Sequence, residues 1–293
     1  MKKRNITSQI LLTIAFIVIC VMIIVPFVLV VSVSLSSETD IAKYGYRLIP
    51  KNIDFSAYKY VFSNPGAVIN AYKITAIFSF LGTFLSVLFM AMASYALSVS
   101  DLKGRSAFSM FFYFTMLFSG GLVPSYILIT QYLHLNNTIW VYILPTLISP
   151  WHMFMMRTFF SQIPKEISES AMIDGASEYR IFLQMIIPLS KPVIATMFLL
   201  GFLTRWNEWN IAMLYIDDQN LISLQYLLQR IMKNIEVLQQ AEDMAGTMVS
   251  VADIPSETSR MAMAVVVAGP ALLIFPFFQK YFVKGLTVGS VKG

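Results

Sequence analysis

The stretch IPKEISESAMIDGASEYRIFLQMIIPLSKP, residues 163–192, is a charged island in an otherwise apolar chain, and it decides the fold. Pro164 suits a first helical turn. The early acidic residues Glu166 and Glu169 complement the positive end of a helix dipole. A short helix is therefore expected to open the island.

Asp174 and Gly175 are expected to end that helix. Gly readily adopts the left-handed conformation found after helix ends, and Asp can cap the helix that follows. A second helix is predicted over 176–187, stopped by Pro188 and Pro192. The island is thus a predicted helix-turn-helix.

The corner between these helices combines small residues with an apolar patch. The small residues are Ala171, Gly175 and Ala176, and the apolar residues are Ile173, Phe182 and Met185. This combination favours a socket for another protein. An ordinary cytoplasmic hairpin that packs on its own chain is the alternative.

The composition excludes a soluble globular protein. The chain of 293 residues is 57% hydrophobic and 13% charged, whereas soluble domains carry about 25% charged residues. Uncharged runs near the length that a bilayer requires lie at 9–33, 74–99, 106–133, 138–156, 193–214 and 261–279. We therefore expect an all-α membrane protein with six transmembrane helices, because only helices and closed barrels satisfy the backbone in lipid.

The distribution of basic residues predicts the orientation. The N-terminal apolar run is too long for a signal peptide and lacks a cleavage site, so it is expected to stay as a span. On one side of the predicted spans lie Lys2, Lys3, Arg4, Lys103, Arg105, Arg157, Lys165, Arg180, Lys191, Lys280, Lys284 and Lys292. The positive-inside rule makes this side cytoplasmic, with both termini inside, although Lys43, Arg47, Lys51 and Lys59 fall in the first outer loop. The net charge of +5 then reflects topology and gives no argument for nucleic acid.

The sequence offers no catalytic, metal or nucleotide site. Cys20 is the single cysteine, so no intrachain disulfide can form. His134 and His152 have no cysteine or carboxylate at ligand spacing. Because no GxxxxGK[ST] motif occurs, any ATPase that drives the protein must be a separate subunit.

Two stretches at membrane depth are candidates for a substrate path. Trp206, Asn207, Glu208, Trp209 and Asn210 supply faces and polar edges that can stack on and hydrogen-bond to a sugar. An interfacial aromatic belt is the alternative. Arg205 and Glu208, at i and i+3, can neutralise each other or mark a functional site. Gly120 and Gly121, in the run 118–124, predict either a packing kink or an unwound stretch along a pathway.

The island resembles the EAA loop of ABC importer permeases. The matching residues are Glu169, Ala171, Asp174, Gly175, Ala176, Phe182, Pro188 and Pro192, and the departure is Ser170 where the family usually has Ala. The resemblance implies that 163–192 is a cytoplasmic coupling loop gripped by an ATPase subunit. It also implies two ATPase copies that hold ATP and Mg, with no cofactor in this chain.

The C-terminus and the last outer loop resemble those of the maltose-importer-type permease. In the tail 284–293, the resemblance implies ATPase contacts by Gly285, Thr287, Gly289 and Lys292; a frayed terminus is the alternative. In the loop 215–259, which is rich in acidic residues with a helical stretch near 221–242, it implies contact with an extracytoplasmic solute-binding protein. A solvated linker is the alternative there.

The chain is therefore identified as resembling a type I ABC importer permease of the carbohydrate class, with one permease domain over 1–293. The resemblance implies alternating access, a second homologous permease and a bacterial inner-membrane location. The W-N-E stretch and residues 118–124 resemble importers of oligosaccharides, including acidic alginate and pectin types. The alternatives are an ion-coupled secondary transporter and a non-transporting scaffold. Deep charge confined largely to Arg205 and Glu208 argues against an ion-coupled carrier.

Overall fold

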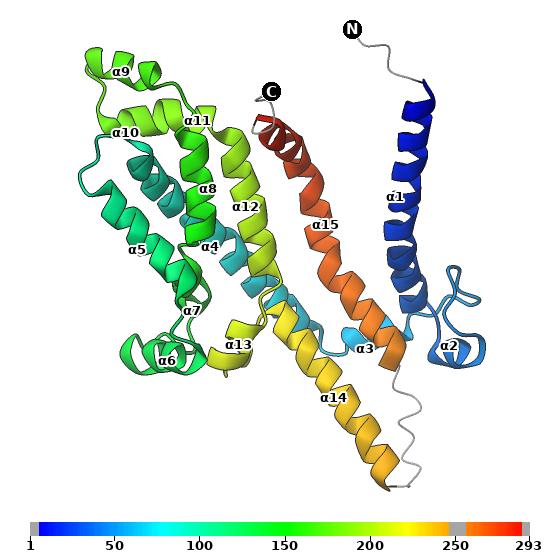
Figure 1. The fold of residues 1–293 in the computed structure, drawn as a ribbon. Helices are drawn as coiled ribbons and strands as arrows, with labels where there is room; N and C mark the ends of the chain where they lie inside the picture. The colour runs from blue at the N-terminus through cyan, green and yellow to red at the C-terminus, as the bar shows by residue number, and fades with distance from the viewer. Residues whose placement is uncertain (1–5, 246–255, 289–293) are drawn as a thin grey trace. The chain divides into compact units, whose positions relative to one another are not determined.

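A computed structural model describes residues 6–245 and 256–288 (Figure 1). The chain divides into two compact units, one formed by residues 1–66 and 228–270 and the other by residues 67–227 and 271–293. Every regular element within the described ranges is helical. The all-α prediction is confirmed.

Three helices begin in one unit and end in the other, and the remaining elements each belong to one unit. The helices that span both are α4 (Pro65–Ser98), α14 (Leu224–Ala245) and α15 (Ser256–Val288). The first unit also contains α1 (Ile6–Ser34), α2 (Glu38–Tyr44) and α3 (Ser56–Val61). The second contains α5 (Arg105–Leu117), α6 (Leu122–Ile127), η1 (Leu128–Tyr132), α7 (Trp140–Ile143), η2 (Leu144–Thr146), α8 (Pro150–Phe160), α9 (Lys165–Ile173), α10 (Glu178–Ile181), η3 (Phe182–Ile186), α11 (Ile187–Leu189), α12 (Lys191–Trp206), α13 (Asn210–Tyr215) and η4 (Gln219–Leu221).

The membrane spans are more broken than the sequence predicts. In the described ranges, α1, α4 and the segment Ser256–Ile274 are long and apolar enough to cross a bilayer. Arg105–Leu117 with Leu122–Tyr132, and Glu178–Leu189 with Lys191–Trp206, pass the same test only as pairs, bent by 113° and 80°. The chain is thus a multi-pass membrane protein. The predicted spans 106–133, 138–156 and 193–214 are not continuous helices.

Two of these interruptions have a local cause. Between α5 and α6 the backbone turns at Gly121, whose φ of 85° suits glycine. Pro150 begins α8, and because proline has no N–H it cannot donate to the carbonyl of Thr146 four residues earlier. Residues 207–209 separate α12 from α13.

In the second unit, α4 packs through a buried stripe of small and polar residues. The stripe consists of Ala71, Thr75, Ser79, Gly82, Thr83, Ser86 and Ser94. Small residues let membrane helices approach closely. Thr83 of α4 consequently lies against Gly201 of α12, and Ser94 Oγ donates to the carbonyl of Met153 in α8 at 2.8 Å.

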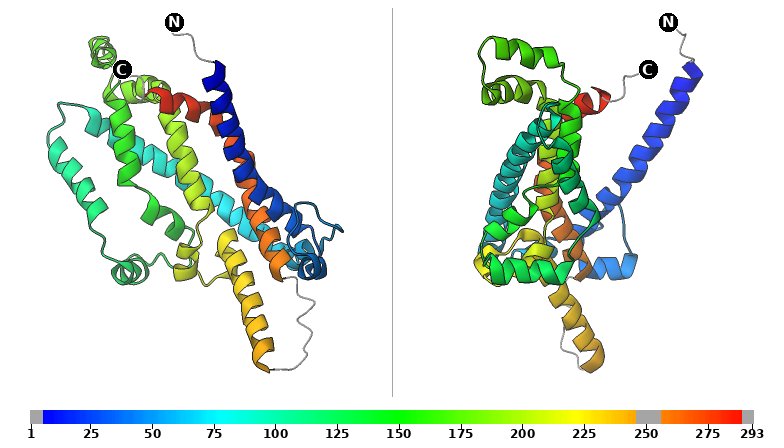
Figure 2. Two further views of the ribbon diagram at one scale, coloured as in Figure 1. Left: turned by 45° about the vertical axis from the view of Figure 1, so that its right-hand side comes forward. Right: turned by 60° about the vertical axis from the view of Figure 1, so that its left-hand side comes forward.

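Two apolar clusters lie along this packing. One joins Met90, Met153 and Phe182 with their neighbours. The other centres on Phe78, which stacks on Tyr142 with ring centroids 4.3 Å apart. Figures 1 and 2 show α9, α10 and α11 at one end of the second unit and α6 and α13 at the other.

In the first unit, Glu38 of α2 caps the N-terminus of α15. Its carboxylate accepts hydrogen bonds from the backbone N–H groups of Glu257 and Thr258, at 3.0 and 3.1 Å. It also accepts from the hydroxyls of Ser256 and Thr258, at 3.2 and 2.9 Å. The first N–H groups of a helix have no intrahelical acceptor, and a carboxylate there also suits the helix dipole.

A charged cluster extends this cap. Arg260 Nη2 lies 3.2 Å from Glu236 Oε1, and Arg260 Nη1 lies 3.4 Å from Glu257 Oε1. Tyr46 donates to the other Glu257 oxygen at 3.1 Å. This hydrogen bond and the nearby negative charge raise the pKa of Tyr46 above its usual value. The cluster ties the loop after α2 to α14 and α15.

We expect Glu38→Ala to destabilise the protein by about 2 kcal/mol, because it leaves the first N–H groups of α15 without their acceptor. Glu38→Gln keeps one acceptor oxygen and should lose less. Thermal unfolding of the purified protein in detergent measures both. Equal melting temperatures for wild type and Glu38→Ala would show that the cap does not hold α15.

Candidate functional site

The corner after α9 has the geometry expected of a helix that ends at glycine. Gly175 has a φ of 78°. Its N–H donates to the carbonyl of Met172 at 3.0 Å, and the N–H of Ala176 donates to the carbonyl of Ala171 at 2.9 Å. These two bonds form a Schellman motif. The left-handed Gly175 is therefore confirmed.

The second half of the island differs from the prediction. The next helix, α10, begins at Glu178 with Ser177 before it, so Asp174 does not cap it. Pro188 lies in the last turn of the continuous helical run Glu178–Leu189, which α10, η3 and α11 form together, whereas Pro192 lies in the first turn of α12. A first turn suits Pro192 because its missing N–H has no helical acceptor to lose. The second helix thus ends at Leu189, two residues beyond the predicted end, and Pro192 begins the next helix after the chain turns at Ser190.

The outer surface of the corner also differs from the predicted socket. Ala171 and Phe182 are buried in the core of the second unit, and Ala176 and Met185 are half-buried against it. Ile173 is 87% exposed, as the sequence predicts for a contact residue. The other exposed apolar side chains here are Met172, Tyr179 and Leu183. The chain therefore offers an outer patch of Met172, Ile173, Tyr179 and Leu183.

Polar contacts fasten the corner to the end of α4. Tyr95 of α4 donates to Glu178 Oε2 at 2.7 Å, and its ring lies 5.3 Å from that of Phe182. Lys165 Nζ donates to Ser100 Oγ at 3.0 Å. Thus α10 is bonded to α4 itself, and α9 is bonded to the turn that follows α4.

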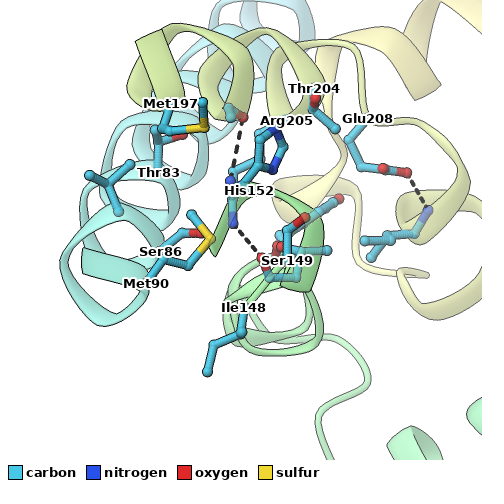
Figure 3. Close-up of a pocket in the computed structure, with 15 residues that line it drawn as sticks. Thr83, Ser86, Met90, Ile148, Ser149, His152, Met197, Thr204, Arg205 and Glu208 are labelled. Carbon is cyan, nitrogen blue, oxygen red and sulfur yellow. Dashed lines mark hydrogen bonds between the residues drawn. The ribbon is translucent and has the colours of Figure 1, made fainter. Parts of the chain in front are cut away.

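A second candidate site is a cavity of about 190 Å³ between α4, α8 and α12, which we call the Arg205 pocket (Figure 3). Its polar lining comes from these three helices, from the stretch before α8 and from the residues just after α12. These residues are Thr83, Ser86, Thr146, Ser149, His152, Thr204, Arg205 and Glu208. Met90 and Met197 complete the apolar wall. The pocket is a polar site inside the apolar packing of the unit.

Arg205 is the most deeply placed charge of this pocket, with 7% of its surface exposed. Its Nη2 donates to the carbonyl of Thr146 at 2.7 Å, and its Nη1 to the carbonyl of Gly201 at 3.4 Å. The Thr146 carbonyl is the one that Pro150 cannot serve. Arg205 thus replaces a backbone hydrogen bond missing from the broken helix.

Arg205 and Glu208 do not neutralise each other, which corrects that prediction. The two ion pairs found among the described residues both involve Arg260. Glu208 Oε1 instead accepts from the backbone N–H of Ile211 at 2.8 Å (Figure 3). The carboxylate therefore holds the first turn of α13.

The predicted path residues fall in different environments. Glu208 lines the Arg205 pocket. Trp206 is 4% exposed and stacks on Phe202 at 5.5 Å, whereas Trp209 is 40% exposed. Asn207 bonds to the carbonyl of Leu203 and to Gln225, and Asn210 begins α13.

Gly120 and Gly121 are not in the lining of this pocket. They lie, exposed, in the break between α5 and α6. The chain is therefore unwound at these two glycines, as one of the two alternatives predicted. This unwound stretch lies apart from the Arg205 pocket.

Sequence reasoning missed the residues that line the pocket together with Arg205. Thr83 and Ser86 belong to the small and polar stripe of α4, and that periodicity marks them as buried. Ser149 and His152 stand on either side of the Pro150 break, which could have flagged them. From the sequence, His134 and His152 were considered only as metal ligands, so no place in a polar pocket was predicted for His152.

The tail and metal predictions are only partly covered by the structure. Gly285 and Thr287 lie within helix α15, whereas Gly289 and Lys292 fall outside the described residues. Across the described ranges, no three His, Cys, Asp or Glu side chains gather closely enough to hold a metal ion.

Comparison with known proteins defines the class. Residues 63–288 match the family described as binding-protein-dependent transport system inner membrane component. The chain belongs to this family, and it is a transport permease of the ABC importer type rather than an enzyme.

Similar proteins cover nearly the whole chain. Protein LplC of Bacillus subtilis is 36% identical over 92% of this chain and 90% of its own. The polygalacturonan/rhamnogalacturonan transport system permease protein YtcP of Bacillus subtilis is 36% identical, covering 95% and 94%. The arabinooligosaccharides transport system permease protein AraQ of Halalkalibacterium halodurans is 31% identical over 100% of both.

A solved structure supports the same fold. A chain of a bacterial ABC transporter involved in the import of the acidic polysaccharide alginate superposes with a TM-score of 0.79 at 26% identity. The match covers 96% of this chain and 99% of that one. The type I permease architecture is therefore confirmed.

Trp206 and Trp209 should respond differently to truncation. Trp206→Ala empties a buried site and should destabilise the protein by about 3 kcal/mol, with Trp206→Phe milder. Trp209→Ala should change stability by less than about 1 kcal/mol. Heating the purified protein and measuring the monodisperse fraction tests this. Unchanged stability in Trp206→Ala together with lost transport would favour a sugar contact instead.

Proposed function

We propose that this permease imports oligosaccharides as one half of a heterodimeric pore. The pore partner is a second, homologous permease. Two ATPase subunits, which hold ATP and Mg, bind the cytoplasmic face, and a solute-binding protein delivers the sugar from outside. Support comes from the family and from relatives whose names specify pectin-type and arabinose oligosaccharides.

The observation that carries the proposal is the corner formed by α9 and α10. It presents the exposed patch of Met172, Ile173, Tyr179 and Leu183 outward and is fastened to α4 through Tyr95 and Lys165. An ATPase that grips the patch can therefore pull on a helix that also lines the Arg205 pocket. This is the linkage that alternating access requires.

The orientation follows from the same assignment. With the corner facing the ATPases, the basic side of the chain and both termini are cytoplasmic, in agreement with the positive-inside rule. The loop 215–259 then faces the solute-binding protein. The tail residues Gly285, Thr287, Gly289 and Lys292 are proposed to reach the ATPases.

Reconstitution of this permease with its pore partner, ATPases and binding protein tests the function. ATP inside the vesicles should drive uptake of arabino- or galacturonate oligosaccharides. Uptake driven by a proton or sodium gradient without ATP would instead identify an ion-coupled carrier.

Gly175→Leu should leave the protein folded but uncouple ATP hydrolysis from transport. A side chain at a φ of 78° costs about 1 kcal/mol or more, although a β-carbon there would meet nothing within 4 Å. The strain therefore deforms the corner rather than the core. Gly175→Asn, which tolerates this conformation, is the matched control. Normal sugar-stimulated ATPase activity in Gly175→Leu would contradict the coupling role.

Glu169→Lys should weaken association with the ATPases. Glu169 is exposed on α9, and loss of one member of an interface charge pair can cost about 2 to 5 kcal/mol. Glu166→Lys, on the first turn of the same helix, is the control and should assemble normally. Copurification of the ATPase measures both. Wild-type copurification with Glu169→Lys would show that Glu169 is only a solvated helix residue.

A further inference from the structure

Arg205 is a buried cation without a charged partner among the described residues. It lies in α12, part of a helix pair apolar enough to cross a bilayer, with 7% of its surface exposed. Charged groups at such positions are costly and are usually paired or functional. Glu208, which lines the same pocket, directs Oε1 to the Ile211 amide. Among the described residues, no carboxylate therefore forms an ion pair with Arg205.

The hydrogen bonds that Arg205 makes within the chain use only part of its guanidinium. A guanidinium has five N–H donors in a planar fork. One serves the Thr146 carbonyl at 2.7 Å, and another makes a long bond of 3.4 Å to Gly201. The buried Nε has no hydrogen-bond partner in the described part of the chain. Because Nε is enclosed against Gly82 of α4, the N–H groups left for a ligand are the second ones of Nη1 and Nη2, which suit an anion with two oxygens.

Two glycines leave the space that the guanidinium occupies. A β-carbon on Gly82 of α4 would lie 3.0 Å from Nε, and one on Gly201 of α12 would lie 3.3 Å from Nη1. Both contacts are tighter than ordinary packing allows. The helices on both sides thus accommodate the guanidinium of Arg205.

The rest of the lining suits a ligand with hydroxyl groups. Thr83, Ser86, Ser149 and Thr204 carry hydroxyls, and Glu208 offers carboxylate oxygen as an acceptor. Chloride and sulfate have no hydroxyl hydrogens for Glu208, and a neutral sugar has no charge for Arg205. A sugar ring that bears both hydroxyls and a carboxylate matches both groups.

We propose that the Arg205 pocket binds a uronic acid residue, with Arg205 as the donor to its carboxylate. The proposal rests on the proposed function and specifies its substrate class as acidic oligosaccharides. The cavity of about 190 Å³ is smaller than the roughly 300–1,000 Å³ of complete ligand pockets. It therefore takes one ring of a chain, and the second permease supplies the remainder of the path.

The first test compares charged and neutral substrates in the reconstituted importer. The probes are digalacturonate and its neutral methyl ester, used with Arg205→Gln and Arg205→Lys. Arg205→Gln should lower the transport preference for the acid over the ester by roughly thirtyfold or more, the loss expected when a buried charge partner is removed. Arg205→Lys should retain part of the preference. Arg157→Gln, which removes a half-buried arginine outside the pocket, should leave it unchanged.

An unchanged acid preference in Arg205→Gln, or equal loss for acid and ester, would overturn the proposal. Equal loss would mean that Arg205 only supports the broken helix through Thr146.

A second test keeps Arg205 and so does not depend on the folding of its variants. Thr204 is an exposed residue of the pocket lining, and Thr204→Cys in a Cys20→Ser background provides a thiol beside Arg205. In the full complex, digalacturonate should slow maleimide labelling of this thiol, and the methyl ester should not. Equal protection by both probes, or protection by neither, would overturn the proposal.

Failure of this inference and failure of the proposed function give different results. If the importer takes up neutral oligosaccharides with ATP and its transport does not depend on Arg205, the proposed function stands and the uronate site is rejected. A complex that takes up neither neutral nor acidic oligosaccharides with ATP loses both.

Discussion

The hydrogen bond from Arg205 to the Thr146 carbonyl is the constraint on which the centre of the second unit depends. A broken helix in a membrane protein exposes carbonyls that no water or lipid can serve, and each costs several kcal/mol if left alone. Pro150 creates such a carbonyl, and a side chain from α12 supplies the donor at 2.7 Å. Burying that donor in turn requires Gly82 and Gly201 beside it. The helix break at Pro150, the buried Arg205 and the two glycines therefore depend on one another.

In the same unit, α4 contacts both the corner after α9 and the Arg205 pocket. α4 contributes Tyr95, which bonds to Glu178 near one end, and Thr83 and Ser86, which line the pocket further along. Tight packing through small residues makes a helix of this kind move as a body, because packed interfaces have few intermediate arrangements. The proposed coupling between the corner and the pocket therefore has a single helix, α4, that contacts both.

The sequence was sufficient for the features that depend on local chemistry. Hydrophobic run lengths predicted α1, α4 and the membrane part of α15, and the Asp-Gly pair predicted the left-handed end of α9. The sequence was insufficient for helix ends and side-chain orientations that tertiary contacts determine. Pro188 and Pro192 were both taken as stops; the second helix does end close to Pro188, at Leu189, but Pro192 begins α12, because a proline is equally compatible with a first helical turn. Phe182 was expected to face a partner, yet its ring packs inward beside Tyr95.

The Arg205 pocket shows why spacing alone misjudges charges in a membrane. Arg205 and Glu208 are three residues apart, which on a continuous helix would bring their side chains together. The helix ends at Trp206, so the two leave in different directions and each satisfies a backbone group instead: Thr146 for Arg205 and Ile211 for Glu208. A helix break at this point thus converts a self-neutralising pair into a separated donor and acceptor. Such a separation is what a polar ligand needs, because a closed ion pair would have to be broken before either group could bind it.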